Sequence, residues 1–458
     1  MFMQDNTFHS HIKASIKLGI PLVGAQLAQM LITVIDTIML GWLGVDELAA
    51  GTLAGQIFFL FLIFALGFGA AIIPLVAGAL GRDEPREVRR SARMGLWALL
   101  GLSILFMFPL WFTEEILVAI GQQQNLAELA DRYMKIAQWS MIPAFLLIGL
   151  RSFLTSLEQA QIVMWFTFIT AALNAILNYA FIFGNFGAPR LEMEGAAIAT
   201  LISNLFAFAI TALFVWRHSS TQPFEIFTRF WRPDWAALKQ VFAMGIPISL
   251  TILAEAGLFS MATVMIGWLG TIPLAAHGVA LQIASMAFMV PLGLSQVASV
   301  RVGRAVGRRD KIALGHAGNA AIALALAFAL FSGLIFVLFP QPLIQLFLDE
   351  ANPQSPAVLT YATSLLLMAA LFQIVDGAQA VAGGALRGLS DTKIPMIIAT
   401  VSYWPLGLSI AWLFGFYFEF GGVGVWFGLV FGLLSASIFL NHRFWARNKL
   451  GLGAANLD

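Results

Sequence analysis

The sequence alternates between long, predominantly apolar runs and short polar connectors. A helix needs about 20 apolar residues to cross a membrane, and twelve runs are long enough. They predict helices at 16–42, 51–79, 92–113, 131–157, 161–184, 194–216, 238–268, 276–303, 316–339, 358–387, 394–416 and 422–443. No connector is long enough to fold alone. The pattern therefore predicts an all-α integral membrane protein with twelve transmembrane helices.

The first half of this pattern returns in the second half of the chain. The GWLG at 41–44 aligns with the GWLG at 267–270, and Pro21 aligns with Pro247. The same register holds without a gap until Arg82 aligns with Arg308, which chance does not produce. The chain is therefore predicted to be a duplication of a six-helix unit.

The repeat sets the predicted domain organisation. Each half holds an even number of spans, so the two six-helix bundles are related by a pseudo-two-fold axis along the membrane normal. A polar linker at 217–237 separates an N-terminal lobe, 1–216, from a C-terminal lobe, 238–458. Two such halves can rock against each other and give alternating access. A channel built from a repeat is also compatible with the pattern.

Composition supports a membrane protein and excludes several functions. Hydrophobic residues make up 60% of the chain and charged residues 11%, with a mean hydropathy of +0.86, which is far outside the range of soluble proteins. The absence of cysteine excludes disulfides and thiolate metal sites. A formal net charge of +1 gives no sign of a nucleic-acid partner.

The distribution of Lys and Arg predicts the topology. If the N-terminus is cytoplasmic, all but three of the 25 basic residues fall on the cytoplasmic side. The three outside are Arg132, Lys135 and Arg190. Both termini are therefore predicted to be cytoplasmic.

Three acidic residues fall inside predicted spans: Asp36, Glu255 and Asp376. A carboxylate in the middle of a bilayer costs about 2.5–3.5 kcal/mol on insertion scales, and no Lys or Arg is expected deep in a span to neutralise it. Each acid is therefore a candidate site for a proton, a metal cation or a positively charged substrate. A protonated, hydrogen-bonded acid in the core is the structural alternative.

The duplicated halves place these acids at different depths. Asp36 aligns with Ala262, and Glu255 aligns with Gln29. Gln29 and Asp36 are seven residues apart and so lie on one stripe of a helix, about 10 Å apart along its axis. Each half is thus predicted to carry its own charged site on a shared scaffold.

Polar residues share the predicted depth of Asp36. Asn178 and Thr200 both lie six residues from the outer end of their spans, as Asp36 does, and Asn174 is one turn below Asn178. One carboxylate, two amide oxygens and a hydroxyl form an oxygen set that a hard monovalent cation accepts, in competition with a proton. Simple hydrogen bonding between helices is the alternative.

In the second half, Glu255 and Asp376 are predicted to face one central cavity. Aromatic and methionine side chains supply cation–π and adaptable apolar contacts for organic cations, although such residues are more often core or lipid-facing. The candidate lining residues of the cavity are Gln29, Phe259, Met261, Gln282, Phe288 and Met289. The candidate ligands of a monovalent cation in the two halves are Asp36, Asn178, Glu255 and Asp376.

Motifs for other functions are absent from the sequence. It contains no G-x-x-x-x-G-K-[ST] loop to bind ATP, no H-E-x-x-H motif and no set of nucleophile, base and metal ligands. The chain is therefore predicted not to be an enzyme and to need no cofactor. A secondary transporter driven by an ion gradient fits best. A flippase for a lipid-linked substrate and a passive channel are the alternatives.

Several segments resemble the multidrug and toxic compound extrusion (MATE) family, in its bacterial NorM-type branch. They are the span with Asp36 and GWLG, the loop ALGRDEPREVRRSARMG, PAFLLIGLRSFLTSLEQ (143–159), LNAILNYAFIFGNFGAPRLEMEGAAIATLIS (173–203) and GGALRGLSDTKIP (383–395). The resemblance covers essentially the whole chain.

The resemblance implies a V-shaped, two-lobed protein of the bacterial inner membrane. Such a protein exports small organic, lipophilic cations in exchange for Na⁺ or H⁺. A two-lobed bundle needs no partner beyond the surrounding membrane lipids, so the chain is predicted to be a monomer. The matching positions imply cation coordination by Asp36, Asn174, Asn178 and Thr200 in the first lobe. In the second lobe they tie Glu255 and Asp376 to cation coupling.

Overall fold

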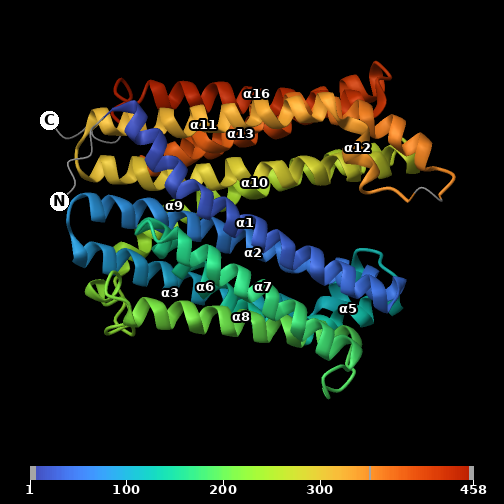
Figure 1. Cartoon of the computed structure of the whole chain (residues 1–458), viewed down its shortest axis with the longest axis horizontal. Coiled ribbons are helices and arrows are strands. Elements are labelled where there is room, and N and C mark those ends of the chain that lie inside the picture. The colour runs from blue at the N-terminus through green and yellow to red at the C-terminus, as the bar shows by residue number, and fades with distance from the viewer. Residues whose placement is uncertain (1–6, 350–351, 453–458) are drawn as a thin grey trace. The chain divides into compact units, whose positions relative to one another are not determined.

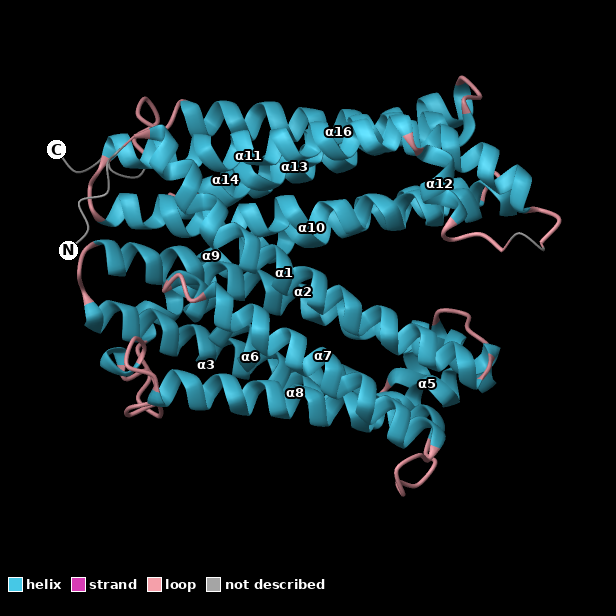
Figure 2. Cartoon of the chain, viewed as in Figure 1, coloured by secondary structure: helices cyan, strands magenta, loops and turns pink. Residues whose placement is uncertain are grey.

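The computed structural model describes residues 7–349 and 352–452, and within these ranges helices joined by loops are the only regular elements, without strands (Figures 1 and 2). The helices of the first half are α1 (Phe8–Leu43), α2 (Val45–Gly81), α3 (Pro85–Leu110), α4 (Thr113–Ala119), α5 (Gln124–Ala137), α6 (Met141–Ser156), α7 (Ala160–Phe183) and α8 (Glu192–Arg217). A short 3₁₀ turn, η1 (Gln138–Ser140), joins α5 to α6. A second, η2 (Gln222–Phe224), follows α8.

The second half has the same succession of long helices. They are α9 (Trp235–Gly267), α10 (Thr271–Gly307), α11 (Lys311–Leu338), α12 (Pro340–Gln345), α13 (Ser355–Gly388), α14 (Lys393–Val401), α15 (Ser409–Trp412) and α16 (Gly421–Trp445). Two π-helical segments, η3 (Ser402–Leu408) and η4 (Leu413–Tyr417), alternate with α14 and α15 in one span.

The twelve predicted spans are confirmed, since twelve helical segments of the described residues are long and apolar enough to cross a membrane. The short helices α4 and α12 were not predicted.

Several spans begin before their apolar run, because polar side chains can begin a helix. The Asp310 side chain, for example, accepts hydrogen bonds from the backbone nitrogens of Ile312 and Ala313, at 3.1 and 2.8 Å. This N-cap starts α11 at Lys311, ahead of the predicted 316.

The span built from α14, η3, α15 and η4 departs from regular α-helix. Pro405 lies inside η3 and has no N–H to donate to the helical ladder. Gly432 of α16 faces this segment closely: a Cβ added there would lie 3.0 Å from the Gly407 Cα and from the Ser402 carbonyl oxygen. The absence of side chains at Gly407 and Gly432 therefore lets α16 pack directly on the π-helical backbone. Such π-helical turns often occur at functional sites.

The described chain divides into two compact units. The first unit comprises Gly24–Ser249, and the second comprises the start of α1 up to Val23 together with the chain from Leu250 onward. The two bounds fall inside α1 and α9 at equivalent positions of the repeat. The predicted division into lobes at the linker 217–237 stays a prediction. Each unit has buried apolar clusters of its own, around Phe68 and Phe145 in the first and around Trp426 in the second.

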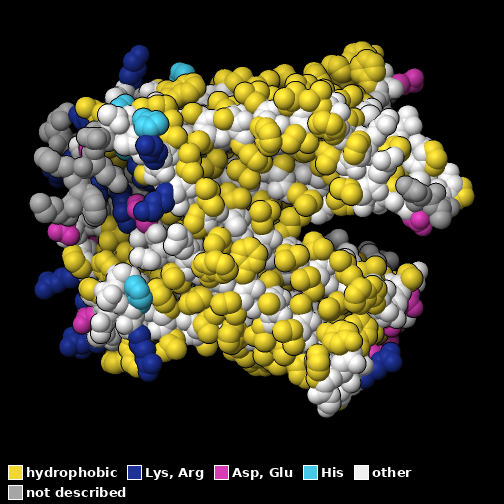
Figure 3. Space-filling model, in the orientation of Figure 1, with side chains coloured by type: hydrophobic (Ala, Val, Ile, Leu, Met, Phe, Trp, Pro, Cys, Tyr) yellow, Lys and Arg dark blue, Asp and Glu magenta, His cyan; other side chains and the backbone are white. Residues whose placement is uncertain are grey.

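The outer faces of the helices are apolar. Figure 3 shows hydrophobic side chains over the flanks of the helices, with Lys and Arg gathered mainly near one end. Large residues such as Leu105 and Phe331 are 63% and 61% exposed. Exposed apolar surface on this scale suits contact with lipid.

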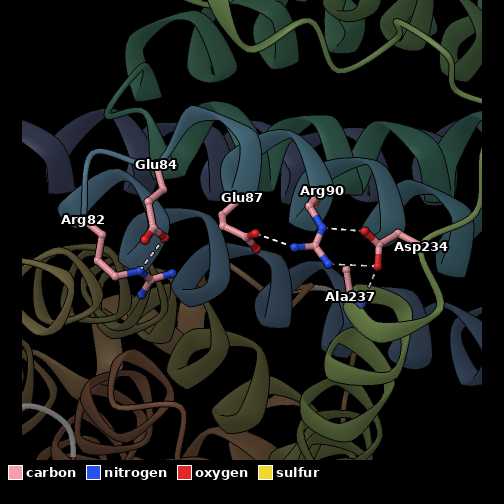
Figure 4. A network of polar contacts seen from close by, with 6 residues as sticks. All are labelled: Arg82, Glu84, Glu87, Arg90, Asp234 and Ala237. Carbon is pink, nitrogen blue, oxygen red and sulfur yellow. Dashed lines mark hydrogen bonds and ion pairs between the residues drawn. The ribbon is translucent and has the colours of Figure 1, made fainter. Parts of the chain in front are cut away.

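Within the first unit, residues 222–234 form a strap bound along one face of α3. The guanidinium of Arg89 lies 2.9 Å from the Glu225 carboxylate, and the Trp97 indole nitrogen donates to the Phe230 carbonyl at 2.8 Å. Arg90 binds both carboxylate oxygens of Asp234 and also pairs with Glu87 at 2.5 Å (Figure 4). The linker between the halves is therefore attached to α3.

We expect this attachment to weaken in acid and on loss of Arg90. Hydrogen bonds from Arg90 hold the pKa of Asp234 below its ordinary value. A lowered pKa favours the ionised carboxylate in the attached strap, so the contribution is present at neutral pH and is lost as pH falls through that lowered pKa. Arg90→Ala should raise the rate of limited proteolysis of the strap about 5-fold, corresponding to about 1 kcal/mol.

Arg86→Ala is the matched control, because Arg86 is an exposed residue of the same helix. Equal cleavage rates in Arg90→Ala, Arg86→Ala and the unaltered protein would show that the strap does not depend on this ion pair.

Candidate functional site

The first unit holds a polar cluster around Asp36 of α1. The amide nitrogen of Asn178, on α7, donates to Asp36 Oδ1 at 2.5 Å and to Asn174 Oδ1 at 3.2 Å. Asn174 also hydrogen-bonds the Asp36 carboxylate. Both asparagines are fully buried, whereas Asp36 is half-buried. The structure thus brings together three of the four residues of the predicted oxygen set.

The fourth residue, Thr200 of α8, hydrogen-bonds the hydroxyl of Tyr133 on α5. Tyr133 is also close enough to Asp36 to act on it electrostatically. Tyr133 was not predicted as a member of this cluster. The only signal for it in the sequence was that tyrosine is rare in this chain, with five in all.

The oxygen atoms of this cluster suit a small hard cation. Asn178 Oδ1 is buried and has no hydrogen-bond partner among the described residues, although buried polar atoms are nearly always paired. An unpaired amide oxygen on a residue that binds a carboxylate can serve as a cation ligand. The oxygen set of Asp36, Asn174 and Asn178 therefore fits a monovalent cation or, on Asp36, a proton, and participation of Thr200 stays a prediction.

The second unit holds a cluster around Glu255 of α9 and Asp376 of α13. The amide nitrogen of Gln379 donates to Glu255 Oε1 at 3.1 Å and to Asp376 Oδ1 at 3.3 Å. The hydroxyl of Tyr403, in η3, donates to Gln379 Oε1 at 3.0 Å. The two predicted acids are thus joined through one amide. Gln379 and Tyr403 were not predicted.

Arg387 corrects the expectation that no basic residue reaches the acids. It lies in the last turn of α13, where its charge acts on Glu255. Its guanidinium donates to Ser295 Oγ at 2.6 Å, and among the residues that the structure describes it forms no ion pair with either acid. The cluster therefore has two carboxylates and one nearby guanidinium, without a closed salt bridge.

Arg151 and Gln29 form the corresponding contact in the first unit. Arg151 Nη1 donates to Gln29 Oε1 at 2.9 Å. Gln29 aligns with Glu255 in the repeat, and Leu150-Arg151 matches Leu386-Arg387. Each half thus sets an arginine near the same position of its first helix, and only the second half has a carboxylate there.

The position of Asp36 is apolar in the second half. Ala262 is completely buried, and the neighbouring Thr263 Oγ1 contacts His277 Nε2 at 3.0 Å. The Trp426 indole donates to His277 Nδ1 at 3.1 Å. Because Nδ1 accepts this bond, Nε2 carries the ring hydrogen and His277 is neutral. In the second half, the region equivalent to Asp36 therefore holds a hydrogen-bonded network of uncharged side chains, Thr263, His277 and Trp426, and no acid.

The candidate lining residues lie in different surroundings. Phe259 packs on the apolar core of its unit, with its ring centroid 5.8 Å from that of Phe372. Met261 is more than one-third exposed, and Gln29 is exposed and bound to Arg151. Gln282, Phe288 and Met289 are half-buried on α10. Their contact with a substrate stays a prediction.

A multivalent metal centre finds no support among these side chains. Within residues 7–349 and 352–452 there is no group of three or more His, Cys, Asp or Glu side chains that could hold a metal ion. The two clusters have one and two carboxylates respectively, which suits monovalent charge.

Twelve apolar helices in a duplicated chain, with carboxylates inside the spans, define a multi-pass membrane transporter. The profile of the MatE family matches the chain twice, over residues 21–180 and 247–413. The two matches start at Pro21 and Pro247, which are the aligned prolines of the internal repeat. The chain therefore belongs to the MATE family of transporters, which are not enzymes.

Full-length relatives agree with this assignment. A "Probable multidrug resistance protein NorM" from Rhizobium meliloti is 48% identical over 441 residues, covering 96% of this chain and 94% of the relative. A protein of the same name from Agrobacterium fabrum is 46% identical over 441 residues, covering 96% of this chain and 95% of its own.

Solved structures share the fold. An outward-facing multidrug resistance MATE family transporter superposes with a TM-score of 0.86 at 22% identity, covering 95% of this chain and 96% of the other. A MATE protein in the bent conformation gives a TM-score of 0.86 at 21% identity, covering 97% of each chain. The predicted fold class is therefore confirmed at the level of a twelve-helix MATE fold.

Proposed function

We propose that the protein is an antiporter that exports cationic, lipophilic small molecules in exchange for Na⁺ or H⁺ by alternating access. The observation that carries the proposal is a carboxylate cluster inside the spans of each unit, neither closed by a salt bridge among the described residues. Acids are retained there at a cost that apolar packing does not offset. A positive charge that binds and leaves would explain why they are kept.

The names of the relatives support the substrate class. Both are described as multidrug resistance proteins, and adaptable apolar surfaces accept molecules of varied shape. The relatives are bacterial, which supports placement in the inner membrane. The excess of Lys and Arg on one side supports cytoplasmic termini. One chain has both clusters, so we propose that a monomer suffices.

The clusters suggest a division of tasks. Asp36, Asn174, Asn178 and Thr200 hold the coupling cation in the first unit. In the second unit, Glu255 and Asp376 bind the same coupling cation, Na⁺ or H⁺, or the positive group of a substrate. Binding of any one neutralises negative charge at the site, so the cation and the substrate compete for it, and exchange follows from that competition.

Efflux from proteoliposomes tests this function. Purified protein is reconstituted with ethidium inside, and Na⁺ and H⁺ gradients are imposed separately. One gradient should accelerate ethidium export over protein-free vesicles, and an ionophore that collapses it should abolish the acceleration. Export of equal rate without any gradient would indicate a passive channel. Movement of a labelled lipid-linked sugar without ethidium export would indicate a flippase.

A further inference from the structure

We propose that Gln379, held by Tyr403, is a positioning residue that stabilises the cation-free Glu255–Asp376 pair and thereby promotes release of the coupling cation. This inference rests on the proposed antiport function. It assigns a role to Gln379 and Tyr403, two residues that do not themselves bind the exchanged cation.

The orientation of the Gln379 amide is fixed by its partners. Its oxygen accepts from the Tyr403 hydroxyl at 3.0 Å, so its nitrogen must face the acids, and each amide hydrogen has one carboxylate to bind, at 3.1 and 3.3 Å. Gln379 is 4% exposed and Tyr403 is 0% exposed. Rotation of the amide would break all three bonds of this buried side chain.

These bonds favour the cation-free state. A carboxylate that accepts N–H donors is stabilised in its charged form, and a carboxylate that binds a proton or a metal ion becomes a weaker acceptor. The groups that act electrostatically on either acid are Glu255, Asp376 and Arg387. Tyr403 is the further titratable group that they face. Gln379 is not titratable, and its amide nitrogen donates a hydrogen bond to each of the two acids.

Gln379 lies in α13, and the residue that orients its amide, Tyr403, lies in the π-helical segment η3. Tyr403 and Trp404 are neighbours in it, and the Trp404 indole donates to the Ala254 carbonyl at 3.1 Å, next to Glu255 in the chain. The ring of Trp404 lies against Gly257, where an added Cβ would be 2.7 Å from it. One turn of η3 therefore contacts the acid site both through Gln379 and through the backbone of α9.

Two variants test the role in the reconstituted, full-length protein. Gln379→Leu removes both donors, and Tyr403→Phe removes only the hydroxyl that orients the amide. Without these bonds the acids should retain the coupling cation more tightly. The cation concentration at half-maximal ethidium efflux should fall about 10-fold in Gln379→Leu and about 3-fold in Tyr403→Phe, and the maximal rate should fall as well.

Two controls carry the same chemical changes elsewhere. Gln373→Leu alters a buried glutamine of α13 that donates to the Ala284 carbonyl and, among the described residues, forms no hydrogen bond with either acid. Tyr417→Phe alters an exposed tyrosine of η4. Both should keep the half-maximal cation concentration of the unaltered protein. General damage to the fold would lower the maximal rate without tightening cation binding.

The outcomes separate this role from the function itself. If unaltered protein exports ethidium under a gradient while both variants keep its half-maximal cation concentration, the positioning role is wrong and the antiport function stands. If unaltered protein shows no gradient-driven export, both are wrong. If Gln379→Leu fails to insert, Tyr403→Phe alone decides, because it removes a single oxygen atom.

Discussion

Asp36→Asn is expected to reduce gradient-driven efflux at least about 100-fold, which corresponds to about 2.7 kcal/mol on the transport barrier. The substitution keeps the size of the side chain and an oxygen that can accept from the Asn178 amide, so the contact between α1 and α7 can persist. It removes the negative charge that the surrounding amide and hydroxyl oxygens cannot replace. The predicted loss is therefore one of cation binding and not of folding.

Ethidium efflux from proteoliposomes under the driving gradient measures the effect, with the amount of inserted protein determined in the same vesicles. Asp46→Asn is the matched control, since Asp46 is exposed in the first turn of α2 and should tolerate the change. Wild-type efflux rates in correctly inserted Asp36→Asn would remove the first cluster from the coupling mechanism.

Glu255→Gln and Asp376→Asn are expected to have comparably large effects, each reducing efflux at least about 100-fold. The double variant should be little worse than either single one, because both carboxylates are bound by the same Gln379 amide and act as one unit. If the two residues did not interact, the fold-reduction in efflux rate in the double variant would be the product of the two single reductions.

The comparison requires all three variants in proteoliposomes, with Glu419→Gln as a control at an exposed position outside the spans. Losses that multiply in the double variant would show that Glu255 and Asp376 act independently. Full activity in either single variant would show that a single carboxylate of the pair is sufficient for transport.

Most of the fold could be predicted because the lipid environment imposes a simple rule. Each span must be an apolar helix of sufficient length, so the twelve runs give the number and order of the spans directly. Local departures could not be derived in this way. Pro405 lies in an apolar run and signals a disturbed helix, but whether the chain responds with a kink or with the π-helical turns η3 and η4 depends on packing against α16.

The sequence indicates how far along each span the site residues lie, but not their direction around each helix. A rise of about 1.5 Å per residue gives the height of Asp36, Asn178 and Thr200 in their spans. The rotation of each helix about its axis is set by packing, which a single sequence does not reveal. The acids were therefore found as unusual residues in apolar runs. Gln379 and Tyr403 are uncharged and are less unusual in an apolar run, so only their hydrogen bonds in the structure identify them as part of the site.

The division of the chain inside α1 and α9 has a consequence for its evolution. Each half of the duplicated sequence begins with a stretch of helix that belongs to the unit formed mostly by the other half. A single-copy ancestor with the same contacts could not have completed its packing alone. It would have been a homodimer whose subunits exchanged their amino-terminal segments, and gene fusion would then have turned a contact between subunits into one within a single polypeptide.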